Sequence, residues 1–168
     1  VLPKVSILWL IYNLRKSCLN FVTQKVAYGA ACAKLRILNS EHLNEAGEPI
    51  VQKGKIALGN LDAKRDWGYA GDYVEAMWSI LQQNKPDDFI IATGEMHTIK
   101  ELCEVAYKIV GLNWKKYVYV DKRFIRPTET GPLIGNPSKA KRILKWTSKT
   151  NFEQLVKMMV NAWIAKLK

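Results

Sequence analysis

The chain has 168 residues, 48% of them apolar and six of them Trp, a composition sufficient for one folded domain with a core. Its 26 Lys and Arg residues outweigh 15 Asp and Glu, and the net charge of +11 favours an anionic partner. The basic residues are spread along the chain without a Cys/His finger or an aromatic-flanked glycine motif, so we expect no nucleic-acid partner. A basic nucleic-acid-binding protein remains only a third alternative.

The first apolar run is VSILWLIY, residues 5–12, which predicts a buried helix or strand. It is much shorter than the roughly 20 residues of a membrane span. No small-residue cleavage site follows it, so a signal peptide is not expected either. We therefore expect no membrane partner.

Three elements follow in chain order. NFVTQKVAYGAACAKL, residues 20–35, predicts a helix with Asn20 as its N-cap and apolar residues at helical spacing. Residues 39–54 are polar and rich in turn-forming residues, which predicts an exposed loop. KIALG, residues 55–59, predicts a short strand.

The next helix is predicted over residues 72–83. Asp72 and Glu75 have the spacing of a capping box, and apolar residues including Val74, Trp78 and Leu81 share one face. We expect Trp67 and Trp78 to lie in the core. DDFIIAT, residues 87–93, predicts a strand.

The remaining elements alternate in the same way. Thr98 and Glu101 predict a capping box for a helix whose apolar residues continue to residue 110, and YVYV, residues 117–120, predicts a strand. Two helices are predicted at the end, over residues 138–144 and, behind a Thr150 to Glu153 capping box, over residues 151–167. Strands that alternate with helices indicate an α/β fold.

Cysteine and histidine are few. Cys18, Cys32 and Cys103 are odd in number and widely spaced, which suits free thiols in a reducing compartment, so we expect a cytoplasmic protein. With only His42 and His97 and no Cys-x-x-Cys pair, we expect no metal site. His97 is predicted to be a loop residue before its helix.

No Gly-x-Gly-x-x-Gly pattern follows a predicted strand anywhere in the chain. That pattern lets a helix N-terminus approach the pyrophosphate of a dinucleotide. If the chain derives from a dehydrogenase-type enzyme, we expect its dinucleotide-binding half to be missing.

LGNLDAKRDWGYAGDYVEAMW, residues 58–78, closely resembles GDP-mannose 4,6-dehydratases, which belong to the extended short-chain dehydrogenase superfamily. The resemblance extends from residue 20 to the C-terminus through FIIATGEMHTIKEL, RFIRPTETGPLIGNPSKAKRILKW and FEQLVKMMV. It implies the C-terminal substrate-binding part of a Rossmann-type fold, with the N-terminal dinucleotide-binding half missing. Residues 20–168 would form a GDP-sugar-binding domain, and residues 1–19 a diverged or truncated remnant of the catalytic-lysine helix.

The resemblance also implies a GDP-sugar site. Arg65 and Arg126 would bind the diphosphate, since a guanidinium can contact phosphate oxygens at two points, and Glu129 would hold the ribose hydroxyls. The other implied pocket residues are Asn20, Val22, Lys25, Leu58, Asn60 and Lys64. Without the resemblance, Arg65 and Asp66 would be interpreted as a surface ion pair, and Lys25 and Lys64 as solvated lysines.

Tyr12 and Lys16 in YNLRK have the Tyr-x-x-x-Lys spacing of the superfamily's catalytic pair. They lie only eight residues before Asn20, too close for the family's pair. A better alignment sets WLIYNLRKS on the family helix W-x-x-x-N-Y-R-E, which makes Tyr12 an ordinary helix residue and places Lys4 at the catalytic lysine. Between the two interpretations of Lys4, a solvated terminal lysine is preferred to the catalytic lysine.

On this alignment a family segment is expected to be deleted. The family has a strand and loop of the form GILFNHESPxRG between that helix and the segment beginning at Asn20, where this chain has only Cys18 and Leu19. Its loss would remove a histidine and an arginine that lie near NADP in the family. Gln24, where the family tends to have Arg, and Thr130 with Gly131, where it tends to have Val-Asp, are smaller departures.

The complete family enzyme is a lyase that uses bound NADP to convert GDP-mannose into GDP-4-dehydro-6-deoxymannose and water, and it is typically a homo-oligomer. We expect this chain to be the GDP-mannose-binding, C-terminal portion of such an enzyme, to bind no NADP and to have no dehydratase activity as an isolated chain. The alternative is a non-catalytic GDP-binding, GDP-sugar-binding or subunit-pairing module.

Overall fold

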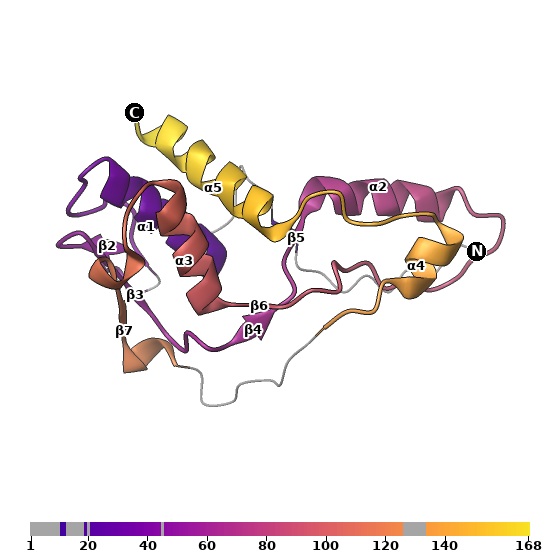
Figure 1. Ribbon diagram of the computed structural model, residues 1–168, viewed down its shortest axis with the longest axis horizontal. Helices are drawn as coiled ribbons and strands as arrows, with labels where there is room; N and C mark the ends of the chain where they lie inside the picture. The colour runs from indigo at the N-terminus through magenta and orange to yellow at the C-terminus, as the bar shows by residue number, and fades with distance from the viewer. Residues whose placement is uncertain (1–10, 13–18, 20, 45, 126–133) are drawn as a thin grey trace. The chain divides into compact units, whose positions relative to one another are not determined.

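The computed structural model describes residues 11–12, 19, 21–44, 46–125 and 134–168 (Figure 1). The chain forms two compact units. Unit 1 comprises residues 1–13, 64–97 and 131–155, and unit 2 comprises residues 14–63, 98–130 and 156–168. The last helix, α5 (Phe152–Leu167), begins in unit 1 and ends in unit 2.

Unit 2 contains a three-stranded sheet with the strand order β2-β3-β7. β2 (Val51–Gln52) pairs antiparallel with β3 (Lys55–Leu58), and β3 pairs parallel with β7 (Val118–Val120). The strands predicted over residues 55–59 and 117–120 are therefore confirmed. With its covering helices, the sheet has the α/β character that the sequence predicts.

The exposed loop predicted over residues 39–54 is wrong at its C-terminal end, which contains β2. Ile50 and Val51 are only 3% and 2% exposed, because they pack into the core of unit 2. The two residues between β2 and β3, Lys53 and Gly54, have φ angles of 49° and 74°. Two successive positive φ angles are typical of a tight hairpin turn, which brings the antiparallel strands together.

Two helices of unit 2, α1 (Val22–Lys34) and α3 (Ile99–Ile109), contribute most of its buried helical residues. Gly29 of α1 lies against the sheet, where an added Cβ would come within 2.8 Å of the Ile56 side chain. The helix predicted over residues 20–35 is confirmed, but its N-cap is Phe21 and not Asn20. Asn20 itself lies outside the described residues.

The capping box predicted for α3 is confirmed. The Glu101 amide donates to Thr98 Oγ1 at 3.0 Å, and the Thr98 amide donates to Glu101 Oε2 at 2.8 Å. These bonds satisfy amides that have no partner within a helix. Leu102, Cys103 and Ala106 are buried, as the 3.6-residue periodicity predicts.

Unit 1 contains α2 (Ala70–Leu81) and α4 (Ser138–Ile143). Its core consists of Tyr73, Ala76, Ile80, Phe89, Ile91, Ala140 and Trp146. The helices predicted over residues 72–83 and 138–144 are confirmed, but the predicted buried face of α2 is wrong. Val74, Trp78 and Leu81 are 58%, 66% and 62% exposed, whereas Trp67 is buried as predicted.

The strand predicted over residues 87–93 is also wrong, because the segment has no strand pairing among the described residues. Its side chains nevertheless alternate, with Phe89 and Ile91 buried and Ile90 46% exposed. The alternation therefore reports an extended segment whose inner residues pack on the core of unit 1.

Two capping predictions fail in α2 and α5. Asp72 lies inside the first turn of α2, whose N-cap is Tyr69. At α5 the capping pair is Asn151 with Gln154, in place of Thr150 with Glu153. The Gln154 amide donates to Asn151 Oδ1 at 2.9 Å, and the Asn151 amide donates to Gln154 Oε1 at 3.0 Å.

Near the N-terminus, β1 (Ile11–Tyr12) pairs parallel with β5 (Gly68–Tyr69). The prediction that Tyr12 is a helix residue is therefore wrong. The alignment of this stretch with the catalytic-lysine helix therefore loses its support at Tyr12, whereas the expected deletion before Asn20 stays a prediction. Lys4, Cys18 and the surrounding segments lie outside the described residues.

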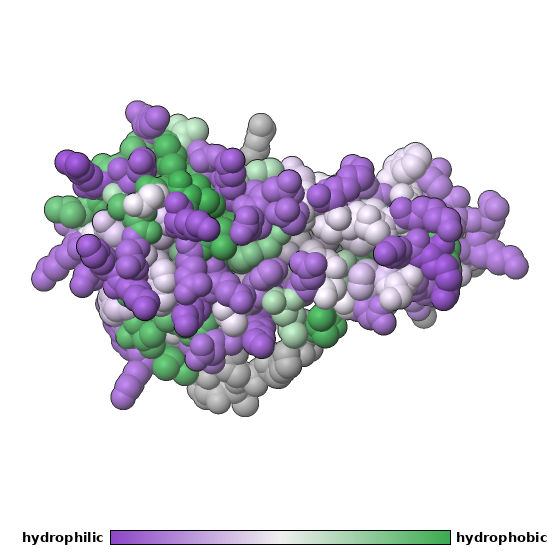
Figure 2. All heavy atoms as spheres, in the orientation of Figure 1, coloured by the Kyte–Doolittle hydropathy of each residue, from purple (hydrophilic) through white to green (hydrophobic). Residues whose placement is uncertain are grey.

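Two further strands, β4 (Lys64–Arg65) and β6 (His97–Thr98), form a two-stranded sheet. His97 is therefore the first residue of a short strand and not a loop residue. Within the described ranges, no helix combines the length and apolarity that crossing a membrane would require. Figure 2 shows hydrophilic residues spread over most of the visible face.

Candidate functional site

The carboxyl ends of β3 and β7 form the structural basis of the candidate site in unit 2. Leu58 at the end of β3 lies opposite Val120 at the end of β7, and both chains leave the sheet in the same direction. Ligands of α/β proteins bind at this edge of a parallel sheet. Gly59 directly follows β3 and is packed against the backbone of Phe124. A Cβ added to Gly59 would lie 2.2 Å from the Phe124 carbonyl oxygen. The end of β3 thus requires a glycine.

Lys25 is the most distinctive predicted residue at this edge. It lies near the start of α1, is only 8% exposed, and its ammonium lies 4.2 Å from the centre of the Phe124 ring. Burial lowers the pKa of Lys25, while the negative charges of Asp121 and Glu48 oppose this shift. A buried ammonium over an aromatic face is attracted by the ring. Lys25 is therefore a fixed cationic group and not the solvated lysine of the alternative interpretation.

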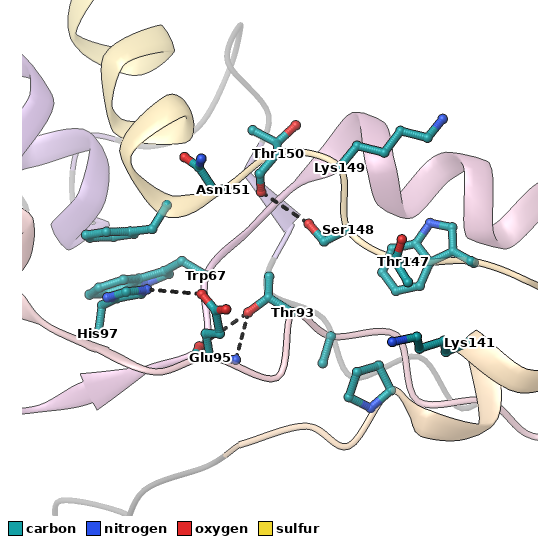
Figure 3. Close-up of a pocket in the computed structure, with 14 residues that line it drawn as sticks. Trp67, Thr93, Glu95, His97, Lys141, Thr147, Ser148, Lys149, Thr150 and Asn151 are labelled. Atoms are coloured by element: carbon teal, nitrogen blue, oxygen red, sulfur yellow. Dashed lines mark hydrogen bonds and ion pairs between the residues drawn. The ribbon is translucent and has the colours of Figure 1, made fainter.

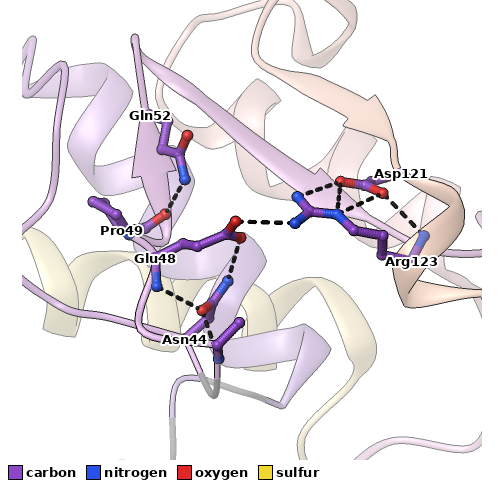
Figure 4. Close-up of polar contacts among 7 residues, drawn as sticks. Asn44, Glu48, Pro49, Gln52, Asp121 and Arg123 are labelled. Carbon is purple, nitrogen blue, oxygen red and sulfur yellow. Dashed lines mark hydrogen bonds and ion pairs between the residues drawn. The ribbon is translucent and has the colours of Figure 1, made fainter.

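Arg123 connects the two acids beside Lys25 (Figure 4). Its guanidinium donates to Asp121 Oδ2 and to Glu48 Oε1, each at 2.9 Å, and Asn44 donates to the same Glu48 carboxylate at 3.3 Å. The hydrogen bonds from Arg123 hold the pKa of both carboxyl groups below their ordinary values. Because its donors are occupied by acids, Arg123 is a less available anion ligand than Lys25.

The first turn of α1 adds a second feature that suits an anion. Within the part of the chain that the structure describes, no side chain caps the helix start at Phe21, and the first turn contains no acidic residue. Helix N-termini carry unsatisfied amides and a partial positive charge. Thr23 is 1% exposed, and its hydroxyl has no hydrogen-bond partner among the described residues. Val22 is the first helical residue of this turn.

The structure places the predicted site residues in two sets. Val22, Lys25, Leu58 and Asn60 belong to unit 2, and Lys64 and Arg65 to unit 1. Leu58 is 3% exposed, so a ligand could reach it mainly through its backbone. Asn60 uses its side-chain oxygen to accept a bond from the Asp62 amide at 2.9 Å. Lys4, Asn20, Arg126 and Glu129 lie outside the described residues.

Arg65 lies on β4 and donates from Nη1 to the Lys64 carbonyl oxygen at 2.7 Å. The neighbouring Asp66 is 8% exposed, and its carboxylate accepts bonds from the Thr93 amide, the Thr93 hydroxyl and the Gly94 amide. Asp66 is therefore a buried structural acceptor. The alternative interpretation, a surface ion pair of Arg65 and Asp66, requires an exposed Asp66 and does not hold.

Sequence reasoning missed Asp121, Arg123 and Phe124, which surround Lys25. A signal was present, because Asp121 directly follows the predicted strand 117–120 and so had to lie at its carboxyl end. The pairing of β7 with β3, which brings this end beside α1, was not visible in the sequence.

Comparison of the sequence with known proteins shows the family to which the chain belongs. A family model described as GDP-mannose 4,6 dehydratase matches residues 9–159. The chain belongs to this family. It is 49% identical over 142 residues to GDP-mannose 4,6 dehydratase 1 of Arabidopsis thaliana, covering 84% of this chain and 35% of the relative. Against the human GDP-mannose 4,6 dehydratase it is 39% identical over 160 residues, covering 85% and 39%.

The chain thus spans a little over a third of the length of these relatives. Among solved structures, RMD from Pseudomonas aeruginosa complexed with NADPH matches at a TM-score of 0.72 and 17% identity, covering 89% of this chain and 44% of that one. UDP-glucose 4-epimerase of Thermotoga maritima with UDP-glucose matches at a TM-score of 0.72 and 18% identity, covering 98% and 46%. At these identities the likeness shows a shared α/β fold.

Proposed function

We propose that these residues form the GDP-sugar-binding, C-terminal part of a GDP-mannose 4,6-dehydratase, and that the chain alone binds GDP-mannose without dehydrating it. The observation that carries the proposal is the family match over residues 9–159, combined with relatives that are more than twice as long. The residues implied by the resemblance belong to the matched region, except Lys4.

The described part of the site has the chemistry that a nucleoside diphosphate requires. Lys25 belongs to the start of α1, and its ammonium lies over the Phe124 ring. The start of α1 and the carboxyl ends of β3 and β7 all belong to unit 2. Helix N-termini and lysines are common phosphate-binding groups. Lys25 with this helix start is therefore the part of the proposal that the described geometry supports best.

The assignments of Arg65, Lys64, Arg126 and Glu129 stay proposals that rest on the family resemblance. Arg65 and Arg126 would contact the diphosphate, and Glu129 the ribose. Asn20 and Asn60 would contribute polar contacts to the same ligand. We do not retain Lys4 as a catalytic residue, because the strand at Tyr12 contradicts the helical alignment on which it depended.

NADP serves the complete family enzyme, but the residues described here do not fit it. The glycine that follows β3, Gly59, is packed against the Phe124 carbonyl, and the chain enters no helix until Ala70. A dinucleotide site needs a strand, a glycine-rich turn and a helix in immediate succession. We therefore assign no NADP contact and no redox step to this chain.

Incubation of the purified chain with GDP-mannose and NADP tests the proposal, with detection of the 4-keto-6-deoxy product. We expect no product, together with saturable GDP-mannose binding in a parallel titration. Steady turnover would contradict the inactive part of the proposal. A chain that folds cooperatively but does not bind GDP-mannose would contradict the binding part.

A further inference from the structure

Unit 1 contains a cavity of about 250 Å³ that none of the residues assigned to the GDP-sugar site lines (Figure 3). Its polar lining comes from the segment after Ile91, from α4 and from the segment before α5. The main polar residues are Thr93, Glu95, His97, Lys141, Thr147 and Asn151. The volume is just below the roughly 300–1,000 Å³ of typical small-molecule sites, so the cavity suits a ligand smaller than a nucleotide.

Two buried carboxylates hold the walls of this cavity in place. Asp66 accepts bonds from the Thr93 amide and hydroxyl and from the Gly94 amide, and so fixes one wall. Asp72, 5% exposed, accepts bonds from the Lys149 and Thr150 amides at 2.9 and 2.8 Å, and so fixes the opposite wall. Walls that are already ordered reduce the entropy cost of binding a ligand.

An aromatic stack forms one side of the cavity. The His97 ring lies 3.8 Å from the Phe152 ring at an interplanar angle of 7°, and Phe152 is stacked in turn with Trp67, at 5.9 Å and 14°. Trp67 is only 2% exposed, so the inner end of the stack is buried. The stack therefore fixes the position of His97, whose Nε2 lies 3.9 Å from Glu95 Oε2.

Three other polar groups that line the cavity have no partner among the residues that the structure describes. The Lys141 ammonium, the Thr147 hydroxyl and the Asn151 side-chain amide nitrogen form no hydrogen bond or ion pair with the described residues. In Figure 3 the Lys141 ammonium points toward the middle of the cavity, whereas the Lys149 ammonium points away from it. Lys149 instead pairs with Glu75.

Because some lining groups are hydrogen-bonded within the protein and others are available to a ligand, we propose that the cavity binds a small polyhydroxylated anion of the sugar phosphate class. Lys141 contacts the anionic group, because it is the cation directed into the cavity with no acidic partner in the described structure. Thr147, Asn151 and the Glu95 carboxylate bond to ligand hydroxyls, since they supply both donors and acceptors. The aromatic stack gives the sugar ring an apolar surface.

Calorimetric titration of the chain with glucose 6-phosphate tests this site. We expect saturable binding with a Kd of about 1 mM or tighter, and about tenfold weaker binding in Lys141→Ala. Glucose and inorganic phosphate, titrated separately, should each bind more weakly, because each engages only part of the cavity. Thr147→Val, which keeps the side-chain shape, should weaken the binding of glucose 6-phosphate less than Lys141→Ala does.

Lys85→Ala is the matched control, because Lys85 is an exposed lysine of unit 1 outside the cavity. Equal losses in Lys85→Ala and Lys141→Ala, or no saturable binding to the folded chain, would overturn the proposal. Displacement of glucose 6-phosphate by GDP would also overturn it, since that result assigns the sugar phosphate to the GDP-sugar site. The experiment can therefore contradict the sugar phosphate site without contradicting the GDP-sugar site, and the reverse also holds.

Discussion

The indole nitrogen of Trp163 donates a hydrogen bond to the side-chain oxygen of Gln24 at 2.8 Å, which joins α5 to α1 inside unit 2. Gln24 is 2% exposed, and its amide nitrogen has no hydrogen-bond partner among the described residues. The resemblance implied an Arg at this position, and the structure has there a buried amide whose oxygen accepts a bond from an indole.

Trp163→Phe should destabilise the chain by about 1–3 kcal/mol, because the buried oxygen of Gln24 would lose its donor. Urea denaturation followed by circular dichroism gives the free energy of unfolding. The double variant Trp163→Phe with Gln24→Leu should recover part of this loss, because both hydrogen-bonding groups are then removed. Trp78→Phe, at a side chain that is 66% exposed, is the control. A double variant less stable than the sum of both single changes would contradict the account.

We expect the free energy of unfolding to fall at alkaline pH, because Tyr107 and Cys103 are buried in their protonated forms. Burial raises the pKa of its phenol far above the ordinary 10.0, and burial likewise raises the pKa of the Cys103 thiol from 9.0 to about 12. The unfolded chain releases these protons at the ordinary values and the folded chain retains them, so stability is complete below pH 9 and falls as the pH rises.

Tyr107→Phe should make this decline shallower. The Tyr107 hydroxyl has no hydrogen-bond partner among the described residues, so its removal should cost little at pH 7. Between pH 10 and 11 the variant should gain about 1 kcal/mol relative to the parent, as one fewer group titrates. Unfolding free energies from pH 7 to 11 measure the slope, with the exposed Tyr119→Phe as control. Identical slopes in parent and Tyr107→Phe would rule the effect out.

Asp72→Asn should destabilise unit 1 by about 2–3 kcal/mol, because the carboxylate accepts bonds from two backbone amides and from Ser148 Oγ. An asparagine side chain keeps the shape but offers one acceptor oxygen in place of two charged ones. Asp88→Asn, at an exposed position, is the matched control and should change stability by less than about 0.5 kcal/mol. Thermal unfolding of both variants makes the comparison, and similar shifts in Tm would count against the role of Asp72.

Of the neighbouring residues Thr150 and Asn151, only Asn151 caps α5, so substitutions of the two should differ in their effect on stability. Asn151→Ala should cost about 0.5–2 kcal/mol, because Asn151 Oδ1 accepts the Gln154 amide bond. Thr150→Ala should cost less, since the Thr150 side chain does not cap the helix in the structure. Chemical denaturation of the two variants reports the difference. A larger loss in Thr150→Ala would restore the capping box predicted from the sequence.

Local patterns predicted local structure well. The α3 capping box was predictable because its two residues lie three positions apart and satisfy one another's amides. The short strands β3 and β7 were also found, from apolar runs bounded by turn residues. These features depend on neighbours in the sequence.

Features decided by distant residues were missed. α2 has apolar residues on two faces, and packing against Phe89 and Ile91 buries Tyr73 and Ala76 while Trp78 remains exposed. Periodicity could not choose between these faces. Asp72 has the spacing of a helix cap, yet its partners lie more than 70 residues later in the chain. In the candidate site, resemblance supplied Lys25, but only the fold placed Phe124 and Asp121 beside it.

Titration of the chain with GDP, in parent and variant forms, tests the central claim most directly. We expect saturable binding, with at least about tenfold weaker affinity in Lys25→Met and in Arg65→Ala and no change in Arg142→Ala, an exposed control on α4. Lys25→Met keeps the buried stem, so circular dichroism should show an unchanged fold. GDP binding that is equally strong in all four proteins would contradict the account.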